Sequence, residues 1–130
     1  MKTSDLMEEE VVFVFESANL GEVIDILVKR RINGLPVVDK QQRVVGIVTE
    51  GDIIARTEIF DRDFDPNKLL LIPIAEIMTT HPITIIKEND IQLALSIFAA
   101  TNIKQLPVVE NDRLVGILAR KDLIKGILKR

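Results

Sequence analysis

Two short stretches of the chain carry residue types that could hold a ligand. Thr49, Gly51 and Asp52 stand within four positions, and a second aspartate, Asp122, follows Ala119 at the same spacing as Asp52 follows Thr49. A carboxylate can accept both hydrogens of a cis-diol, and a hydroxyl can hydrogen-bond to a sugar or a phosphate. The same residue types also form the cap and first-turn acid of a helix. The residues alone leave both interpretations open.

Basic residues accompany the second stretch, whereas the first has a glycine. Arg120 and Lys121 directly precede Asp122, where cations oppose the dipole of the expected helix unless an anion offsets them. An anionic ligand group would do so, and ordinary solvated charge is an equally good explanation. Gly51 would permit close approach to backbone N–H groups, which favour anions at a helix start.

Residues for the common catalytic and metal sites are missing. The chain has no cysteine and one histidine, His81, so neither a thiolate or histidine metal cluster nor a Ser-His-Asp triad can form. No glycine-rich phosphate loop is present. The stretch 61–67 resembles the start of a calcium loop but has Pro66 and Ile72 where that loop needs Gly and Glu. We expect no enzyme, no metal site and no catalytic cofactor.

The two stretches lie at equivalent points of an internal repeat. Ile32-Asn-Gly-Leu-Pro-Val-Val-Asp39 recurs as Ile103-Lys-Gln-Leu-Pro-Val-Val-Glu110. Arg43-Val-Val-Gly-Ile-Val48 recurs as Arg113-Leu-Val-Gly-Ile-Leu118, with one residue fewer in the preceding turn. Such self-similarity predicts two copies of one supersecondary unit.

Helices are predicted in the first half of each copy. Apolar residues recur at helical spacing over 20–28 and again over 91–99. Asn19 and Asp90 precede these segments and are predicted N-caps.

Hairpins are predicted in the second half of each copy. The apolar segments 35–38 and 44–49 flank a polar turn, and 106–109 and 114–118 do the same. Each unit is therefore expected to be strand, helix, strand, turn, strand, helix, in an α/β (α+β) fold of two tandem βαββα repeats.

Boundaries follow from the repeat and from a charged, proline-containing stretch between the copies. We predict a first repeat at 1–60, a linker at 61–73 and a second repeat at 74–130. The stretch 56–73 is expected to begin as the tail of the first repeat's final helix and to continue as a connecting crossover. A unit of about 55 residues has a marginal core of its own. The two halves are therefore expected to pack against each other with pseudo-twofold symmetry, leaving a cleft between related surfaces.

Charge and hydropathy exclude several partners. The net charge is −3, with no basic stripe, which disfavours nucleic acid. No apolar run is long enough to span a membrane, and the acidic N-terminus is unlike a signal peptide. We expect no membrane association and a cytoplasmic location.

The repeated pattern Leu-Pro-Val-Val-Asp/Glu, turn, Val-Gly-Ile, then Asp-Ile/Leu-Ile resembles the CBS domain, and the tandem copies resemble a CBS-domain pair, or Bateman module. The segment Ile77-Met-Thr-Thr-His-Pro-Ile-Thr-Ile85 is similar to the usual start of a repeat in that family. The resemblance implies a regulatory module that binds AMP, ADP, ATP or S-adenosylmethionine in the cleft between repeats.

The resemblance also implies which residues face the ligand. In the first repeat these are Thr49 and Asp52, and in the second repeat Asp122 is kept while Ala119 replaces the hydroxyl. One lost hydroxyl contact is worth about 0.5–1.5 kcal/mol. Residues just before Leu-Pro line the cleft in relatives and often meet phosphates: Asn33, Gly34, Lys104 and Gln105, with Lys104 the best phosphate candidate. An adenine slot could come from the first strands, whose residues are alternatively plain core: Val12, Phe13, Ile83 and Thr84.

Two functions remain open at this stage. A sensor of adenosyl ligands would signal to an unknown protein in trans, and the Thr49/Asp52 motif favours it. A ligand-free assembly module is the alternative, favoured by Ala119, because CBS pairs commonly form homodimers through their helices. Apolar residues of the second helices could serve that contact or pack internally: Ile53, Ile54, Leu123, Ile124, Ile127 and Leu128.

Overall fold

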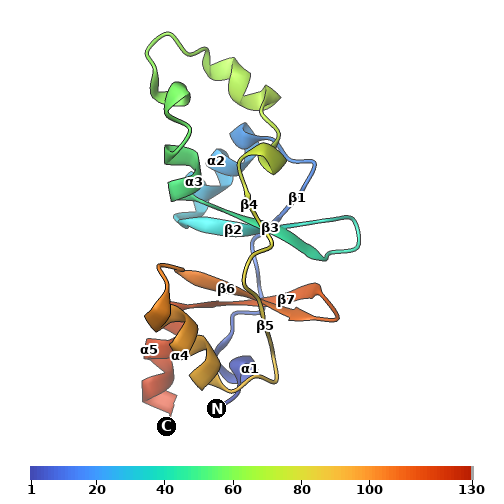
Figure 1. Ribbon diagram of the computed structural model, residues 1–130, viewed down its shortest axis with the longest axis vertical. Coiled ribbons are helices and arrows are strands. Elements are labelled where there is room, and N and C mark those ends of the chain that lie inside the picture. The colour runs from blue at the N-terminus through green and yellow to red at the C-terminus, as the bar shows by residue number, and fades with distance from the viewer. Residues whose placement is uncertain (130) are drawn as a thin grey trace. The chain divides into compact units, whose positions relative to one another are not determined.

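The chain folds into two compact units (Figure 1). The computed structural model describes residues 1–129, and Arg130, the last residue of the predicted second repeat, lies outside the described residues. One unit is Val12–Pro82, which we call the central unit. The other combines Met1–Val11 with the chain from Ile83 onward, and we call it the terminal unit.

The central unit is a mixed sheet with helices on one face (Figure 1). Its strands are β1 (Val14–Phe15), β2 (Gly34–Val38), β3 (Val44–Thr49) and β4 (Thr79–Thr80), in that order across the sheet. Strand β1 runs parallel to β2, and the other neighbours are antiparallel. The helical elements are α2 (Leu20–Arg30), α3 (Glu50–Ile54) and the 3-10 turns η1 (Thr57–Phe60), η2 (Pro66–Leu71) and η3 (Ile74–Glu76).

The terminal unit repeats this plan. Its strands β5 (Ile85–Ile86), β6 (Gln105–Glu110) and β7 (Arg113–Ala119) are adjacent in that order, with the same parallel and antiparallel pairs. Its helical elements are α1 (Thr3–Leu6), α4 (Ile91–Ala100), α5 (Arg120–Gly126) and η4 (Ile127–Lys129). The predicted order of strands and helices is thus confirmed in each repeat.

The leading segments of the two repeats, residues 1–11 and 74–82, each join the sheet of the other repeat. Strand β4 pairs with β3, with Thr79 opposite Ile47. Glu8 forms the equivalent antiparallel bridge with Ile117 on the outer side of β7. Each exchange covers a strand edge that would otherwise have unpaired backbone groups. The predicted boundaries divide the sequence into repeats, whereas the compact units in space follow different boundaries.

Both predicted helix caps are confirmed. The Asn19 side chain accepts a hydrogen bond from the Glu22 N–H at 2.9 Å and donates one to Glu22 Oε1 at 2.6 Å. Asp90 Oδ1 accepts from the Gln92 N–H at 2.9 Å. These bonds satisfy N–H groups of the first turn that have no partner within the helix.

Each unit has an apolar core of its own. In the central unit all five residues of β2 are buried, and two of them, Leu35 and Val37, share the apolar core with the buried face of α2. In the terminal unit Leu6 from α1 joins Phe98 of α4 and the buried residues of β6 and β7. No helix among residues 1–129 has the length and apolar composition needed to cross a bilayer.

The linker differs from its prediction in one respect. Helix α3 ends at Ile54, and a separate 3-10 turn follows at Thr57–Phe60, so the stretch 56–73 does not begin as the tail of that helix. Within the apolar run of the linker, Leu69 and Ile72 pack against the central core, whereas Leu70 and Leu71 are 59% and 77% exposed.

Candidate functional site

Thr49 and Asp52 form a capping box at the start of α3. The N–H and the hydroxyl of Thr49 both donate to Asp52 Oδ2, at 2.9 and 3.1 Å. The Asp52 N–H donates back to Thr49 Oγ1 at 3.3 Å. The helix-cap interpretation of these two residues is therefore confirmed, and it fixes the orientation of the carboxylate.

The second oxygen of the same carboxylate has a partner that the sequence analysis missed. Thr79 Oγ1, on β4, donates to Asp52 Oδ1 at 3.1 Å. The two residues are 27 positions apart, and only the pairing of β4 with β3 brings them together. A signal was available in the repeated methionines Met7 and Met78, which mark equivalent leading segments.

Gly51 leaves open space beside the Thr49 hydroxyl. A Cβ built at Gly51 would meet only Thr49 Oγ1, at 3.6 Å, an ordinary van der Waals distance. The start of β2 lies nearby, because the Glu50 N–H donates to the Asn33 carbonyl at 2.9 Å and Gly34 pairs with Thr49. The structure thus brings together the five predicted site residues of the first repeat that follow its first helix.

The terminal unit has the equivalent arrangement with different chemistry. Asp122 is 8% exposed, and its Oδ2 accepts from the Ala119 N–H at 2.7 Å. Gln105 pairs with Ala119 across the hairpin. Lys104 and Lys121 are both exposed. The predicted residues of the second repeat therefore lie near one another, with alanine where the central unit has a hydroxyl.

Arg120 has a structural role that the sequence analysis did not anticipate. Its guanidinium donates to three backbone carbonyls at and beyond the end of α4: Phe98, Thr101 and Ile103, at 3.3, 3.1 and 3.0 Å. It also lies 5.7 Å from the centre of the Phe98 ring, a cation–π distance. The carbonyl end of α4 offsets this cation, so no phosphate is needed to explain its position. Its contact with a ligand phosphate stays a prediction.

The four residues predicted to form an adenine slot lie directly before strands β1 and β5, not within them. Val12 and Phe13 are half-buried, and Val12 packs against the edge of the central core. Ile83 is 45% exposed and Thr84 is exposed, so the core interpretation is wrong for both. The core positions are taken by the following strand residues, because β1 and β5 start two residues later.

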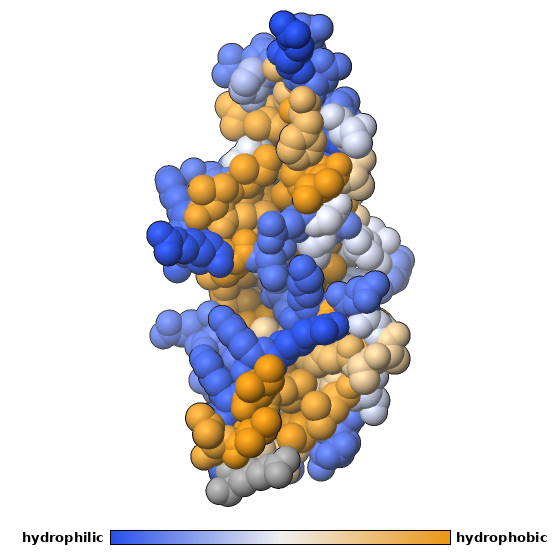
Figure 2. All heavy atoms as spheres, turned by 90° about the vertical axis from the view of Figure 1, so that its left-hand side faces the viewer, coloured by the Kyte–Doolittle hydropathy of each residue, from blue (hydrophilic) through white to orange (hydrophobic). Residues whose placement is uncertain are grey.

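An apolar groove of about 760 Å³ lies on the helical side of the central unit. Its walls come from α2, α3, η1 and η2, and polar residues at its lining include Arg31, Asn33 and Glu50. Figure 2 shows apolar side chains gathered on this face of the unit. Among residues 1–129, no three His, Cys, Asp or Glu side chains are grouped to hold a metal ion.

The family models and the solved structures point to one domain type. The family model of the CBS domain matches residues 4–58 and again residues 74–129. The uncharacterized protein RP505 of Rickettsia prowazekii is 34% identical over 116 residues, which cover 89% of this chain and 34% of that protein. This chain thus spans about a third of the length of that relative.

Solved structures show the same fold. The CBS-domain pair of protein MJ0100, in complex with 5′-methylthioadenosine and S-adenosylmethionine, has a TM-score of 0.81 and 28% identity, covering 99% of this chain and 97% of that one. The complex of CBSX2 with AMP has a TM-score of 0.83 and 23% identity, covering 98% and 96%. CBSX2 is a protein of Arabidopsis thaliana.

Proposed function

Because the chain belongs to the CBS-domain family, we propose that it is a regulatory module that binds an adenine nucleotide or a related adenosyl compound. The observation that carries this proposal is the likeness, over nearly the whole chain, to the MJ0100 pair with its two adenosyl ligands. The AMP complex of CBSX2 provides a third adenosyl ligand on the same fold. The module would act on another protein in trans and perform no reaction itself.

Asp52 is proposed to hold the ribose diol while it keeps its capping role. An ionised carboxylate has about four acceptor positions. The structure uses three of them, for the N–H and hydroxyl of Thr49 and the hydroxyl of Thr79. One ribose hydroxyl can take the remaining position, and the second can take the position that the Thr49 hydroxyl leaves when it turns its hydrogen toward the ligand. The cap holds the carboxylate in place before binding, which reduces the entropy lost on complex formation.

Phosphates, where the ligand has them, are proposed to meet Lys104 and Lys121. Both side chains are exposed and lie on the segments that flank Asp122 and Gln105 in the terminal unit. Arg120 is a weaker candidate because its guanidinium would have to leave the carbonyls that it now contacts. A comparison of the thermal shifts with AMP, ADP and ATP would measure which number of phosphates the protein prefers.

A thermal-shift panel tests the proposal directly. AMP, ADP, ATP and S-adenosylmethionine should be compared with the 2′-deoxy form of any nucleotide that binds. A specific ligand at about 100 times its dissociation constant should add about 2.7 kcal/mol of stability. The deoxy form should lose most of this gain, because it cannot present two adjacent hydroxyls to the carboxylate.

The variant Asp52→Asn tests the role of the charge without removing the capping oxygen. Hydrogen bonds to charged groups contribute about 1.5–3 kcal/mol, so affinity should fall by at least about tenfold. Asp25→Asn is the matched control, since it removes an exposed acid that pairs with Lys29 elsewhere on the central unit. Equal ligand affinity in both variants, or a panel without any shift, would contradict the proposal.

Gly51→Ala separates ligand binding from folding. The added methyl group meets nothing but Thr49 Oγ1 at 3.6 Å, so the free protein should gain up to about 1 kcal/mol in helix propensity. The same methyl group occupies the space through which the ligand is proposed to approach, and affinity should fall. Titration calorimetry combined with urea unfolding would measure both quantities. Unchanged affinity would show that the ligand does not approach Gly51.

Homodimer formation is a second candidate function, favoured by exposed apolar residues beside the groove. Val28, Ile54 and Phe60 are 70%, 60% and 65% exposed. On the terminal unit, Ile124, Ile127 and Leu128 are 67%, 57% and 88% exposed. Two of the predicted contact residues instead pack against the cores of their own units: Ile53 and Leu123.

Sedimentation of variants tests the dimer. Ile54→Glu should shift the chain toward monomer, because a charge would be buried in the contact. Leu71→Glu is the matched control, as Leu71 is 77% exposed and lies outside the groove lining. A wild-type chain that sediments as a monomer would exclude this candidate.

A further inference from the structure

The helical run formed by α5 and η4 has an exposed apolar face. Ile124, Ile127 and Leu128 are 67%, 57% and 88% exposed, and their spacing of i, i+3 and i+4 places them on one side of the run. Another side of the run packs within the terminal unit, because Asp122 and Gly126 are buried there. An amphipathic helix with anchors at this spacing can bind by laying its apolar face into a groove.

Three lysines of the same run form a basic stripe. Lys121, Lys125 and Lys129 are exposed and recur at every fourth residue, which places them along one side of the run. Among residues 1–129, none of the three has an ion-pair partner. The segment 120–129 contains four bases and one acid, so its formal net charge is +3. A groove that binds this run should therefore be apolar and have acids at its border.

The groove of the central unit offers an apolar surface of this kind. It encloses about 760 Å³ between α2, α3, η1 and η2. Val28, Ile54 and Phe60 line it, and they are 70%, 60% and 65% exposed. Exposed apolar side chains that gather on one face of a protein mark a site of interaction with another molecule.

The border of this groove is acidic. The segment 50–65, which supplies α3 and η1 to the walls, contains six acids and two arginines, a formal net charge of −4. One of these arginines, Arg56, already pairs with Glu58. Arg31 adds one cation to the lining, so the lining and the segment together stay acidic. We call the segment 50–65 the acidic segment.

Equivalent positions of the two repeats carry opposite charge. Glu50 follows Thr49 as Arg120 follows Ala119, so an acid of the groove lining corresponds to a base of the helical run. The guanidinium of Arg120 lies over the Phe98 ring of α4, 5.7 Å from its centre. The two helical faces are therefore complementary in charge rather than alike.

From these features we propose that the α5–η4 face of one copy binds in the central groove of a second copy. The apolar residues of the run fill the groove, and the basic stripe meets the acidic segment. The reverse contact, formed by the other two faces, closes the dimer around a twofold axis. This inference goes beyond the binding of an adenosyl ligand and specifies the contact of the homodimer considered above.

Pairing of like faces is weaker for electrostatic reasons. Two α5–η4 faces in contact would bring two basic stripes together, and two grooves in contact would bring two acidic segments together. Like charges across an interface cost free energy and exclude the wrong arrangement, whereas opposite charges fix the correct one. Electrostatics therefore favours the crossed pairing of groove and helical run.

Cross-linking of the full chain tests this pairing, because the chain has no native cysteine. Equal amounts of Ile54→Cys and isotope-labelled Ile124→Cys should be mixed and treated with a bismaleimide. Covalent dimers that contain one chain of each kind should exceed the half that random pairing would give. A mixture of Leu71→Cys with Ile124→Cys is the matched control and should give no such excess, since Leu71 is exposed but lies outside the groove lining.

Charge reversal on the basic stripe gives a second measurement. Lys125→Glu should raise the dissociation constant of the dimer about tenfold in sedimentation at low salt, because the dimer contains the contact twice. Lys40→Glu is the matched control: it makes the same change in net charge at an exposed lysine of the first hairpin turn and should leave association unchanged. Added salt should weaken the wild-type dimer and reduce the difference between the two variants.

The outcomes separate this inference from the proposed function. Covalent dimers of Ile54→Cys alone, in preference to mixed dimers, would show groove-to-groove pairing and overturn the inference. Equal dissociation constants for Lys125→Glu and Lys40→Glu would also overturn it and leave the homodimer standing. A wild-type chain that stays monomeric would overturn both the inference and the homodimer. A thermal shift with an adenosyl compound would support the proposed ligand-binding function in each of these cases.

Discussion

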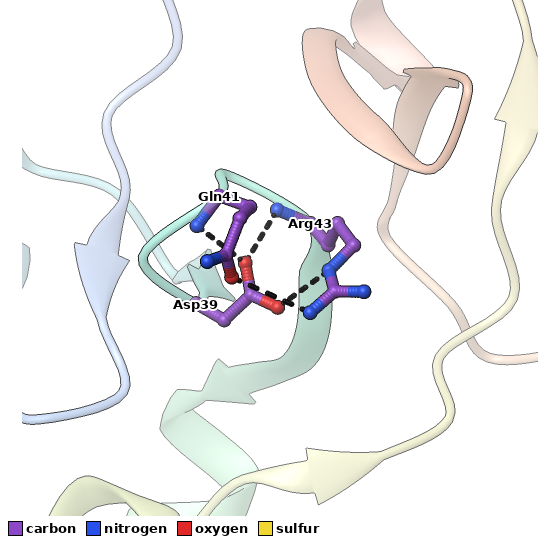
Figure 3. Close-up of polar contacts among 3 residues, drawn as sticks. All are labelled: Asp39, Gln41 and Arg43. Atoms are coloured by element: carbon purple, nitrogen blue, oxygen red, sulfur yellow. Dashed lines mark hydrogen bonds and ion pairs between the residues drawn. The ribbon is translucent and has the colours of Figure 1, made fainter.

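Three aspartate carboxylates, those of Asp39, Asp52 and Asp122, accept hydrogen bonds from backbone N–H groups. Asp39 is 8% exposed, and its Oδ1 accepts from the N–H groups of Gln41 and Arg43, both at 2.9 Å. Its Oδ2 accepts from Arg43 Nε at 2.8 Å (Figure 3). Asp52 and Asp122 serve helix starts in the same way. An acid that satisfies buried backbone donors holds a local conformation, whatever else it binds.

The turn at Asp39 should make stability depend on pH. Desolvation raises the pKa of Asp39, but the hydrogen bonds and charge of Arg43, with the bond from Gln41, lower the pKa more, so that it lies below its usual value. A depressed pKa in the folded state gives stability that is complete above the unfolded pKa of about 3.9 and is lost as the pH falls through the folded value.

Urea unfolding of wild-type protein and Asp39→Asn, between about pH 7 and pH 2, measures this effect. The variant should be less stable at neutral pH, because an amide cannot pair with Arg43 in the same way. The difference should shrink as the pH falls below about 4. A difference that stays constant over the whole range would show that the charge of Asp39 contributes nothing.

At the scale of elements, the two hairpins differ in their turns. Asn111 and Asp112 both have left-handed backbone conformations, with φ of 53° and 66°, in a two-residue turn between β6 and β7. Such a turn favours Asn-Gly, because only glycine adopts positive φ without strain. The turn of the first repeat is one residue longer and has a single residue, Gln42, at positive φ.

Asp112→Gly should therefore stabilise the β6–β7 hairpin. The relief of backbone strain exceeds the entropy that glycine adds to the unfolded chain, for a gain of about 0.5 kcal/mol. Asp112→Ala is the control, since alanine at φ of 66° keeps the strain and should give no gain. The midpoint of urea unfolding measures both variants, and equal midpoints for glycine and alanine would refute the explanation.

At the scale of the whole molecule, each compact unit depends on a segment from the far end of its sequence. Leu6 is 7% exposed in the terminal core, and it packs so closely on α5 that a Cβ at Gly126 would lie 2.8 Å from Leu6 Cδ1. Ile77 is also 7% exposed and joins the central core. Leu6 precedes the first repeat's strands yet packs with the second, and Ile77 does the reverse.

Leu6→Ala should therefore weaken the terminal unit rather than the rest of the first repeat. Deletion of a buried leucine side chain to alanine costs about 2–5 kcal/mol. Hydrogen exchange should become faster in β6 and β7 and stay unchanged in β2 and β3. Ile77→Ala is the matched variant, with the opposite pattern expected. Faster exchange in β2 and β3 on substitution of Leu6 would contradict the exchange of leading segments.

The sequence by itself determined the repeat, the order of strands and helices, both caps at Asn19 and Asp90, and the place of Thr49 and Asp52 at a helix start. The helices, strands and caps depend on residues within about four positions of each other, where side-chain periodicity and capping chemistry act, and the repeat is visible because the same local patterns occur twice. The family resemblance rests on the same local patterns, repeated twice.

Only the tertiary structure decided how the leading segments pair, that Thr79 holds Asp52, and that Arg120 binds the end of α4. The contacts of Thr79 and Arg120 join residues 17 to 27 positions apart, and the bridge between Glu8 and Ile117 joins opposite ends of the sequence. Many pairings of short strand edges satisfy the same apolar pattern, and the packing of each core selects one of them. Side chains at those edges acquire their partners only after that selection.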